Sequence, residues 1–159
     1  MITNALTEQL RALRLGHVIH ALEQQQAQPN TYAEMSFEER LGLLTDYELL
    51  CRDNAKVKRL RRQAKLRLDA QPNGLDYRAE RGLKKTQVAE LMTGQYLHHG
   101  HNILITGATG CGKTYLACAL AEQACRQHHS SRYYRLGQLV DELTISHADG
   151  SYRQKLQQL

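Results

Sequence analysis

The sequence predicts an α/β chain in which a helical N-terminal domain precedes a domain built on a strand, a loop and a helix. Three observations lead to this prediction. Apolar residues recur at helical spacing from residue 6 to residue 68, a Gln-Pro-Asn-Gly run at 71–74 breaks the pattern, and a β-branched stretch at 102–106 leads through a glycine-rich loop into a new helical pattern. We therefore expect a helical domain at 1–70, a linker at 71–82 and a second domain at 83–159.

Two helical stretches make up the expected N-terminal domain. The first ends near Pro29 and is marked by apolar residues at helical spacing, namely Leu6, Leu10, Leu13, Val18 and Leu22. The second opens at Ser36, because a serine followed three residues later by Glu39 forms a capping box. No proline interrupts this second stretch before Ala70, so we expect one long helix up to that residue.

The second half of this long helix is strongly basic. Between residues 52 and 67 the only acid is Asp53, and the window carries a net charge of +7 in a chain whose total is +5. Exposed helix faces usually mix both signs of charge, so this excess predicts a polyanion as partner, most simply the backbone of duplex DNA contacted without sequence preference. An acidic protein surface and plain solvation remain alternatives. The candidate DNA-binding residues are Arg52, Lys56, Lys58, Arg59, Arg61, Arg62, Lys65 and Arg67.

The glycine-rich loop fits the phosphate-binding pattern GxxxxGK[ST]. Small residues allow successive backbone N–H groups to point at phosphate oxygens, and the following helix adds the positive end of its dipole. We expect Lys113 to reach the β- and γ-phosphates of a nucleotide and the hydroxyl of Thr114 to bind Mg²⁺. The candidate nucleotide-binding residues are Gly107, Ala108, Thr109, Gly110, Cys111, Gly112, Lys113, Thr114 and Tyr115, with Thr114 also the candidate metal ligand.

Shorter elements are expected around this unit. The pattern predicts a short helix at 86–92, a strand at 103–105, a second strand at 132–135, a helix at 138–146 and a final helix after the turn at 149–150. No apolar run approaches the roughly 20 residues of a membrane span, and the N-terminus does not resemble a signal peptide, so we expect a cytoplasmic protein without membrane contact.

Cysteine and histidine usage points to no metal site. The four cysteines form no CxxC pair, which favours small buried side chains in a reducing compartment, although the position of Cys111 at a helix N-terminus leaves a reactive thiol open. The last three are spaced by seven, which predicts one helix stripe. The histidines at 98–101 and 128–129 lack a second ligand pair at zinc spacing. The cysteines are Cys51, Cys111, Cys118 and Cys125.

Taken in order, several segments resemble the IstB-like ATP-binding proteins, AAA+ helper ATPases of insertion-sequence transposition that are related to DnaC-type helicase loaders. The resemblance covers nearly the whole chain. Its segments are the SFEERLGLL run at 36–44, the basic helix, Arg81-Gly82-Leu83, the phosphate loop, the LVDEL run at 139–143 and the ADGSY run at 148–152. Tyr115 departs from the family, which commonly has histidine after the Lys-Thr pair, and we expect little consequence of this difference.

The resemblance implies a fold, ligands and partners. The second domain would be the first part of an AAA+ parallel-sheet domain, ATP and Mg²⁺ would be the cofactors, and duplex DNA, the transposase of the same element and further copies of the chain would be the partners. Helicase loading is the alternative activity within this family. A P-loop kinase of small molecules is a more distant alternative, because such an enzyme does not need a basic helical domain of about 70 residues before its phosphate loop.

The resemblance also implies features that the chain does not reach. In such proteins an apolar strand with paired acids, a sensor residue and an arginine finger follow the segment that matches 151–159. We therefore identify no catalytic residue, expect nucleotide binding without hydrolysis by this chain alone, and expect the strand at 103–105 to lack its sheet neighbours. A non-hydrolysing DNA-binding or assembly module is the corresponding alternative function.

Overall fold

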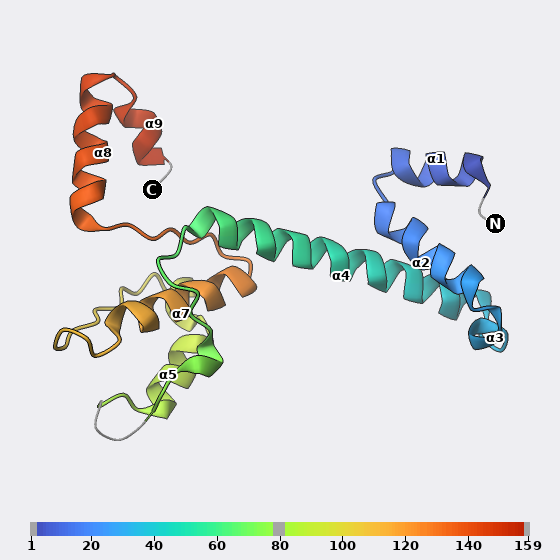
Figure 1. The fold of residues 1–159 in the computed structure, drawn as a ribbon, viewed down its shortest axis with the longest axis horizontal. Coiled ribbons are helices and arrows are strands. Elements are labelled where there is room, and N and C mark those ends of the chain that lie inside the picture. The colour runs from blue at the N-terminus through green and yellow to red at the C-terminus, as the bar shows by residue number, and fades with distance from the viewer. Residues whose placement is uncertain (1–2, 78–81, 158–159) are drawn as a thin grey trace. The chain divides into compact units, whose positions relative to one another are not determined.

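The computed structural model describes residues 3–77 and 82–157, and every regular element in these two ranges is helical (Figure 1). The chain divides into two compact units, Met1–Lys56 and Val57–Leu159, which we describe separately. The α-helices are α1 (Asn4–Ala12), α2 (Gly16–Ala27), α3 (Pro29–Tyr32), α4 (Phe37–Ala64), α5 (Lys85–Met92), α6 (Gln95–His98), α7 (Lys113–Arg126), α8 (Leu136–Ala148) and α9 (Tyr152–Gln157), and η1 (Pro72–Gly74) is a 3₁₀ turn.

In the first unit, the predicted single stretch before Pro29 is two helices. Arg14 has a left-handed φ of 57°, and the Leu15 N–H donates to the Leu10 carbonyl over 2.8 Å, so the chain closes α1 with a left-handed cap and turns into α2. Periodicity alone did not show this turn, because the apolar spacing continues across it.

The core of the first unit packs α2 against the first half of α4. Val18, Ala21 and Leu44 form its buried centre. A buried carboxylate adds polar contacts, since Glu48 on α4 accepts hydrogen bonds from the backbone N–H groups of His17 and Val18 at 3.0 and 3.1 Å. These N–H groups belong to the first turn of α2, where an intrahelical acceptor is missing, so Glu48 stabilises the start of that helix.

The long helix α4 begins with the predicted capping box and ends earlier than predicted. The Ser36 N–H donates to Glu39 Oε2 at 2.7 Å, and the Glu39 N–H donates to Ser36 Oγ at 3.2 Å. The helix stops at Ala64 and not at Ala70, because Lys65 adopts a left-handed φ of 47°. The division between the two compact units falls inside α4, whereas we predicted a domain boundary at residue 70; that boundary stays a prediction.

The second unit is organised around α7. Cys118, Ala119 and Cys125 on this helix are fully buried, and Cys125 packs against Leu60 and Ala64 in the last turns of α4. Burial raises the pKa of the Cys125 thiol, as expected of a structural cysteine. The other face of α7 packs on α5 and on the segment before the phosphate loop through Val88, Leu116, Leu120, Ile103 and Ile105. We predicted that three cysteines lie along one face of this helix. Cys118 and Cys125 lie on α7, but Cys111 lies in the loop before it, so the prediction is correct for two of the three residues.

Neither predicted strand forms within the residues that the structure describes, and the α/β class is therefore not confirmed. Residues 101–108 and 130–135 have no regular secondary structure. A strand requires a neighbouring strand that pairs with its backbone. Leu104, in the middle of the first segment, is 89% exposed, so no packed neighbour among the described residues covers its side chain. At the second segment the Tyr133 N–H donates to the carbonyl of Ala64, the last residue of α4, over 2.9 Å and not to a strand.

The remaining helices follow the sequence patterns closely. The predictions at 86–92, 138–146 and after the turn at 149–150 correspond to α5, α8 and α9, while the short α6 was not predicted. The turn before α9 is closed by Asp149, whose carboxylate accepts from the N–H and the hydroxyl of Ser151 at 2.8 and 2.6 Å. Within the described ranges, no helix has the length and apolar character needed to cross a bilayer.

Candidate functional site

The loop at 107–114 lies between the extended segment and the N-terminus of α7. Gly107, Gly110 and Gly112 have φ values of 150°, 83° and 92°, a backbone conformation that side chains with a Cβ rarely adopt. Gly107 has a second constraint, because a Cβ at this position would lie 3.0 Å from Cys111 Sγ. The glycines of the sequence pattern therefore stand where the folded loop requires them.

The lysine of the pattern lies back across the loop. Lys113 Nζ donates to the carbonyl oxygens of Gly107 and Ala108 at 2.8 and 2.6 Å and lies 3.9 Å from Cys111 Sγ. An ammonium group is thus held inside the curve of the loop. A phosphate oxygen entering that curve would meet a positive charge that is already in place.

Backbone donors add to this charge. Lys113 and Thr114 are the first two residues of α7, and the first N–H groups of a helix have no intrahelical acceptor. The helix dipole concentrates positive potential at the same end. Thr114 lies one residue into the helix and lines a cavity of about 390 Å³ together with Thr109, Gly110 and Gly112.

Lys113 also lines a second cavity, of about 360 Å³. Residues 105–106 and 111–113 form one wall, and Gly74, Leu75, Asp76 and Leu83 form the other. Three of these four residues, at 74–76, come from the region that we predicted to be a linker, so our sequence analysis missed their place in the cavity wall. The sequence showed that the helical pattern breaks at 71–74, but it could not show that this break lies beside the phosphate loop, because that contact depends on the tertiary fold.

Tyr115 attaches this wall to α7. Its hydroxyl donates to the Gln71 carbonyl at 3.3 Å, and Gly74 packs so closely on the ring that a Cβ there would overlap Tyr115 Oη. Tyr115 is therefore a structural contact of the cavity wall. The small consequence that we predicted for tyrosine at this position stays a prediction.

Two of the predicted DNA-binding residues are engaged within the protein. Arg52 donates to Glu48 Oε1 at 2.7 Å and to the Arg14 carbonyl at 2.6 Å. Arg61 pairs with Glu122 of α7, a carboxylate whose side chain is only 6% exposed. The assumption that the basic charge of α4 is uncompensated is thus wrong for these two residues.

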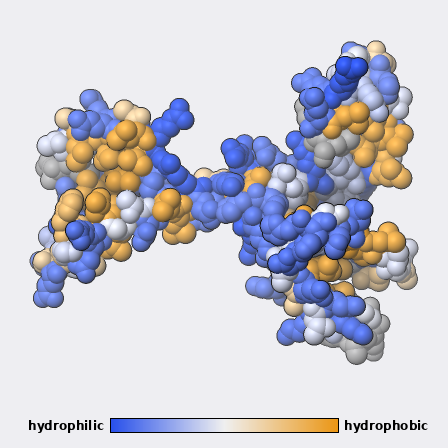
Figure 2. Space-filling model, turned by 180° about the vertical axis from the view of Figure 1, so that it is seen from behind, coloured by the Kyte–Doolittle hydropathy of each residue, from blue (hydrophilic) through white to orange (hydrophobic). Residues whose placement is uncertain are grey.

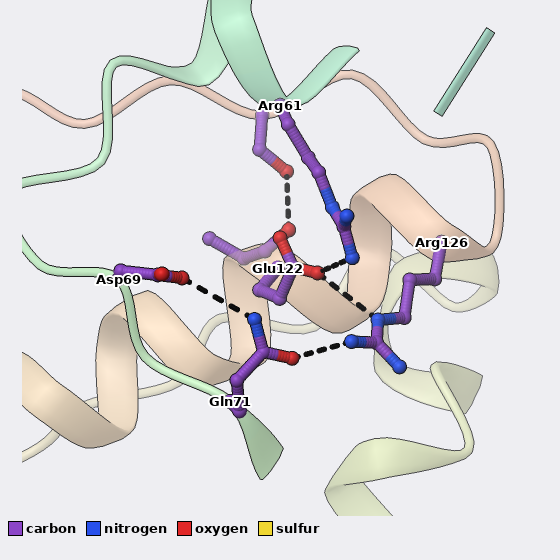
Figure 3. A network of polar contacts seen from close by, with 7 residues as sticks. Arg61, Asp69, Gln71, Glu122 and Arg126 are labelled. Atoms are coloured by element: carbon purple, nitrogen blue, oxygen red, sulfur yellow. Dashed lines mark hydrogen bonds and ion pairs between the residues drawn. The ribbon is translucent and has the colours of Figure 1, made fainter. Parts of the chain in front are cut away.

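Glu122 is the centre of a wider polar network. It also accepts from Arg126 Nε at 3.0 Å, and Arg126 in turn donates to Gln71, whose amide donates to Asp69 at 3.2 Å. Figure 3 shows both guanidinium groups directed at the Glu122 carboxylate, with Gln71 bridging Arg126 and Asp69. The network joins the last turns of α4, the C-terminal half of α7 and the segment at 69–71.

Three exposed basic residues lie near the end of α4, and we call them the basic face: Lys58, Arg59 and Arg62. Leu60 and Ala64 are buried, and Arg62 is two positions from each of them, about 200° around the helix, as Lys58 is from Leu60. No ion pair to these three residues occurs in the part of the chain that the structure describes. In the view of Figure 2, hydrophilic residues cover most of the surface along the middle of α4.

The remaining predicted basic residues lie in other surroundings. Lys56 is exposed and belongs to the first unit. Lys65 and Arg67 lie beyond the helix end, and Arg67 lines the cavity of Thr114 beside the phosphate loop. The structure therefore does not bring the eight predicted residues together into one surface.

The arrangement fits the phosphate groups of a nucleotide. Glycines with positive φ, an ammonium group held by two carbonyl oxygens and free helix N–H groups converge on one loop, and two cavities of small-ligand size adjoin it. When bound, a nucleotide would supply the anionic phosphate charge that these groups are placed to meet. For the metal ion, Thr114 is the one predicted ligand at this loop.

Comparison with known proteins agrees with this geometry. The profile of the family described as IstB-like ATP binding protein matches residues 8–159. A protein assigned as the ATP-binding protein of insertion sequence IS1162 from Pseudomonas fluorescens is 47% identical over 160 residues, which cover 100% of this chain and 69% of the relative.

Two more distant relatives match less of their own length. One assigned as an insertion sequence ATP-binding protein in Sinorhizobium fredii is 40% identical over 75% of this chain and 49% of its own length. One assigned as an ATP-binding protein in an insertion sequence of Mycobacterium tuberculosis is 27% identical over 97% of this chain and 61% of its own length. The chain thus spans between half and about two thirds of these relatives.

Proposed function

Because the chain belongs to the family of IstB-like ATP-binding proteins, we propose that it binds ATP with Mg²⁺ at the loop of residues 107–114 and duplex DNA on the basic face of α4. In this proposal the protein is a helper in the transposition of an insertion sequence. The observation that carries it is the convergence of Lys113, three glycines with positive φ and the N-terminus of α7 on one loop.

The nucleotide part of the proposal rests on charge recognition. Lys113 and the helix N–H groups contact phosphate oxygens, so affinity should depend on the number of phosphates more than on the base. Equilibrium titration with ATP and with AMP tests this expectation, and we expect AMP to bind at least tenfold more weakly. Equal affinity for the two nucleotides would contradict phosphate recognition by the loop.

The proposed role of Thr114 is to hold Mg²⁺. Thr114→Ala should leave ATP binding in the absence of Mg²⁺ unchanged and remove most of the gain in affinity that Mg²⁺ gives. Thr86→Ala, an exposed threonine on α5, is the matched control. An unchanged Mg²⁺ effect in Thr114→Ala would assign the metal to other groups.

The DNA part rests on the basic face. Lys58, Arg59 and Arg62 point away from the core, and they have the reach to contact phosphates along one groove edge of a duplex. No side chain is assigned to base recognition, so unrelated duplexes should bind with similar affinity.

Salt dependence measures this DNA contact directly. Lys58→Gln with Arg62→Gln should weaken duplex binding and reduce the slope of log K against log salt by about 1.8, from about 0.9 for each phosphate released. Lys84→Gln with Lys85→Gln changes the net charge equally at exposed positions of the second unit and is the control. If both pairs change the slope equally, the effect is one of total charge and not of the basic face.

The partners follow from the proposed role. We propose that the protein acts with the transposase of its element and assembles with further copies of itself on DNA. Co-purification of the tagged chain with that transposase in the presence of ATP and duplex DNA tests the first partner. Capture of a replicative helicase instead of the transposase would favour the helicase-loader function.

A further inference from the structure

A second cationic surface lies in the second unit, separate from the basic face. It is a cleft of about 370 Å³ between the end of α4, the extended segment at 132–135 and the helices α8 and α9. We call it the α4–α8 cleft. The cations that line it are Lys65, Arg67, Arg132, Arg135 and Lys155.

Backbone and core contacts fix one side of this cleft. The Tyr133 N–H bonds to the Ala64 carbonyl at 2.9 Å, which holds the extended segment beside the end of α4. The Tyr133 side chain packs on the core cluster of Ala70 and Cys118. Arg132, Tyr134 and Arg135 of this segment line the cleft together with Tyr133.

The charge in the cleft is not balanced by its own residues. Glu142 is the single acid among the lining residues, and it pairs with Lys155. This pairing lowers the pKa of Glu142, and the charge of Lys65 lowers it further. The other four cations share one small cleft, and an anion with several charges would relieve their mutual repulsion.

Tyr134 gives the cleft an aromatic surface among these cations. Side chains of this kind stack on nucleic-acid bases, while guanidinium groups bind phosphates through paired donors. In a duplex the bases are already stacked on one another and cannot reach a side chain in a cleft. A single strand can present its phosphates to the arginines and an unstacked base to the tyrosine at the same time.

We propose that the α4–α8 cleft binds single-stranded DNA, with Arg132 and Arg135 on phosphates and Tyr134 stacked on a base. The volume of the cleft lies in the range of small-molecule sites, which suits one or two nucleotides and not a duplex. This site goes beyond the proposed function, which places duplex DNA on Lys58, Arg59 and Arg62, none of which lines the cleft.

The test measures fluorescence anisotropy of a labelled 20-nucleotide oligo-dT and of a labelled mixed-sequence duplex with the full chain. Arg132→Gln with Arg135→Gln should weaken oligo-dT binding at least tenfold and reduce its salt slope by about 1.4, from about 0.7 for each phosphate of a single strand. The same pair should leave duplex affinity within twofold. Arg132→Lys with Arg135→Lys keeps the charge and should retain most of the oligo-dT affinity, which separates loss of charge from loss of fold.

Stacking has its own test. Tyr134→Ala should weaken oligo-dT binding by about tenfold, and Tyr134→Phe should not, because phenylalanine keeps the ring. Equal losses in both variants would show that stacking does not contribute and would overturn the assignment of Tyr134.

The alternative occupants are separated in the same titrations. If a poly-glutamate peptide of equal charge displaces oligo-dT as well as unlabelled oligo-dT does, the cleft recognises charge alone and the proposal is wrong. Unchanged oligo-dT affinity in the Arg132 and Arg135 pair would also overturn it. Lys58→Gln with Arg62→Gln should weaken duplex binding and leave oligo-dT binding unchanged. The duplex proposal can therefore fail while the cleft proposal holds, and the cleft proposal can fail while the duplex proposal holds.

Discussion

The contact between Gly74 and Tyr115 makes a pair of substitutions informative about the wall of the nucleotide cavity. A Cβ at residue 74 would overlap Tyr115 Oη, whereas the Cζ atom of the same ring would lie 3.5 Å away, an ordinary van der Waals distance. The hydroxyl is also held by its bond to the Gln71 carbonyl. Gly74→Ala therefore has to displace one oxygen atom and break one hydrogen bond.

The size of the effect follows from these contacts. Overpacking by one methyl group costs about 1–3 kcal/mol, and the lost hydrogen bond adds about 1 kcal/mol. Gly74 is not in the left-handed region, so alanine by itself should stabilise the turn by about 0.4–1 kcal/mol through the unfolded state. We expect Gly74→Ala to lower the free energy of unfolding by about 2 kcal/mol.

A second substitution removes the cause. With Tyr115→Phe in place, the overlapping oxygen is absent, and Gly74→Ala should be neutral or slightly stabilising. Urea unfolding followed by far-ultraviolet circular dichroism gives the four free energies of this double-mutant cycle, with an expected coupling of about 2 kcal/mol. If Gly74→Ala costs the same in both backgrounds, Tyr115 Oη is not the contact that matters and the described wall is incorrect.

Three further predictions concern stability. Glu122→Ala should lower the free energy of unfolding of the second unit by about 2 kcal/mol, because it removes two charge-assisted hydrogen bonds; the loss is limited because the two guanidinium partners are 40% and 43% exposed and regain water. Glu90→Ala, at an exposed position of α5, is the control. Equal losses of stability for the two variants in urea unfolding would argue against a stabilising role of the network. Ser36→Ala removes the N-cap of α4 and should cost about 1 kcal/mol in the same assay, with Ser36→Asp close to wild type; a neutral alanine would mean that the capping box contributes nothing. Burial alone would raise the pKa of Glu48, but its bonds to Arg52 and to two backbone N–H groups outweigh burial and lower it. The stability that the Glu48 carboxylate gives the first unit is therefore fully present above its unfolded-state pKa of about 4.3, and it is lost as the pH falls through the lower pKa of the folded state. The helical circular-dichroism signal of the wild type should weaken below about pH 4, and that of Glu48→Gln should depend less on pH.

Local signals in the sequence predicted much of the structure. Ser36 with Glu39 located the start of α4, and the glycine, lysine and threonine pattern located the loop and the start of α7, because each of these features acts within a few residues. The end of α4 was wrong by six residues, since a left-handed lysine at position 65 is not a common stop signal.

Features that depend on tertiary contacts were missed or wrong. The strands at 103–105 and 132–135 have the expected composition, but their pairing depends on neighbours that composition does not encode. The partner of Arg61 is Glu122, 61 residues away in the sequence, and Gln71 meets Tyr115 across 44 residues. Neither pair could be found from spacing, so the basic helix seemed less compensated than it is and the cavity wall was read as a linker.

The most direct test of nucleotide binding at this loop is the ATP affinity of Lys113→Ala measured beside Lys85→Ala, an exposed lysine at the start of α5. Equilibrium dialysis with labelled ATP and Mg²⁺ gives both dissociation constants, and circular dichroism checks that the helical content is unchanged. We expect Lys85→Ala to match wild type and Lys113→Ala to bind at least a hundredfold more weakly, because it loses the one ammonium group held inside the loop. Equal ATP affinity in the two variants would contradict nucleotide binding at the loop.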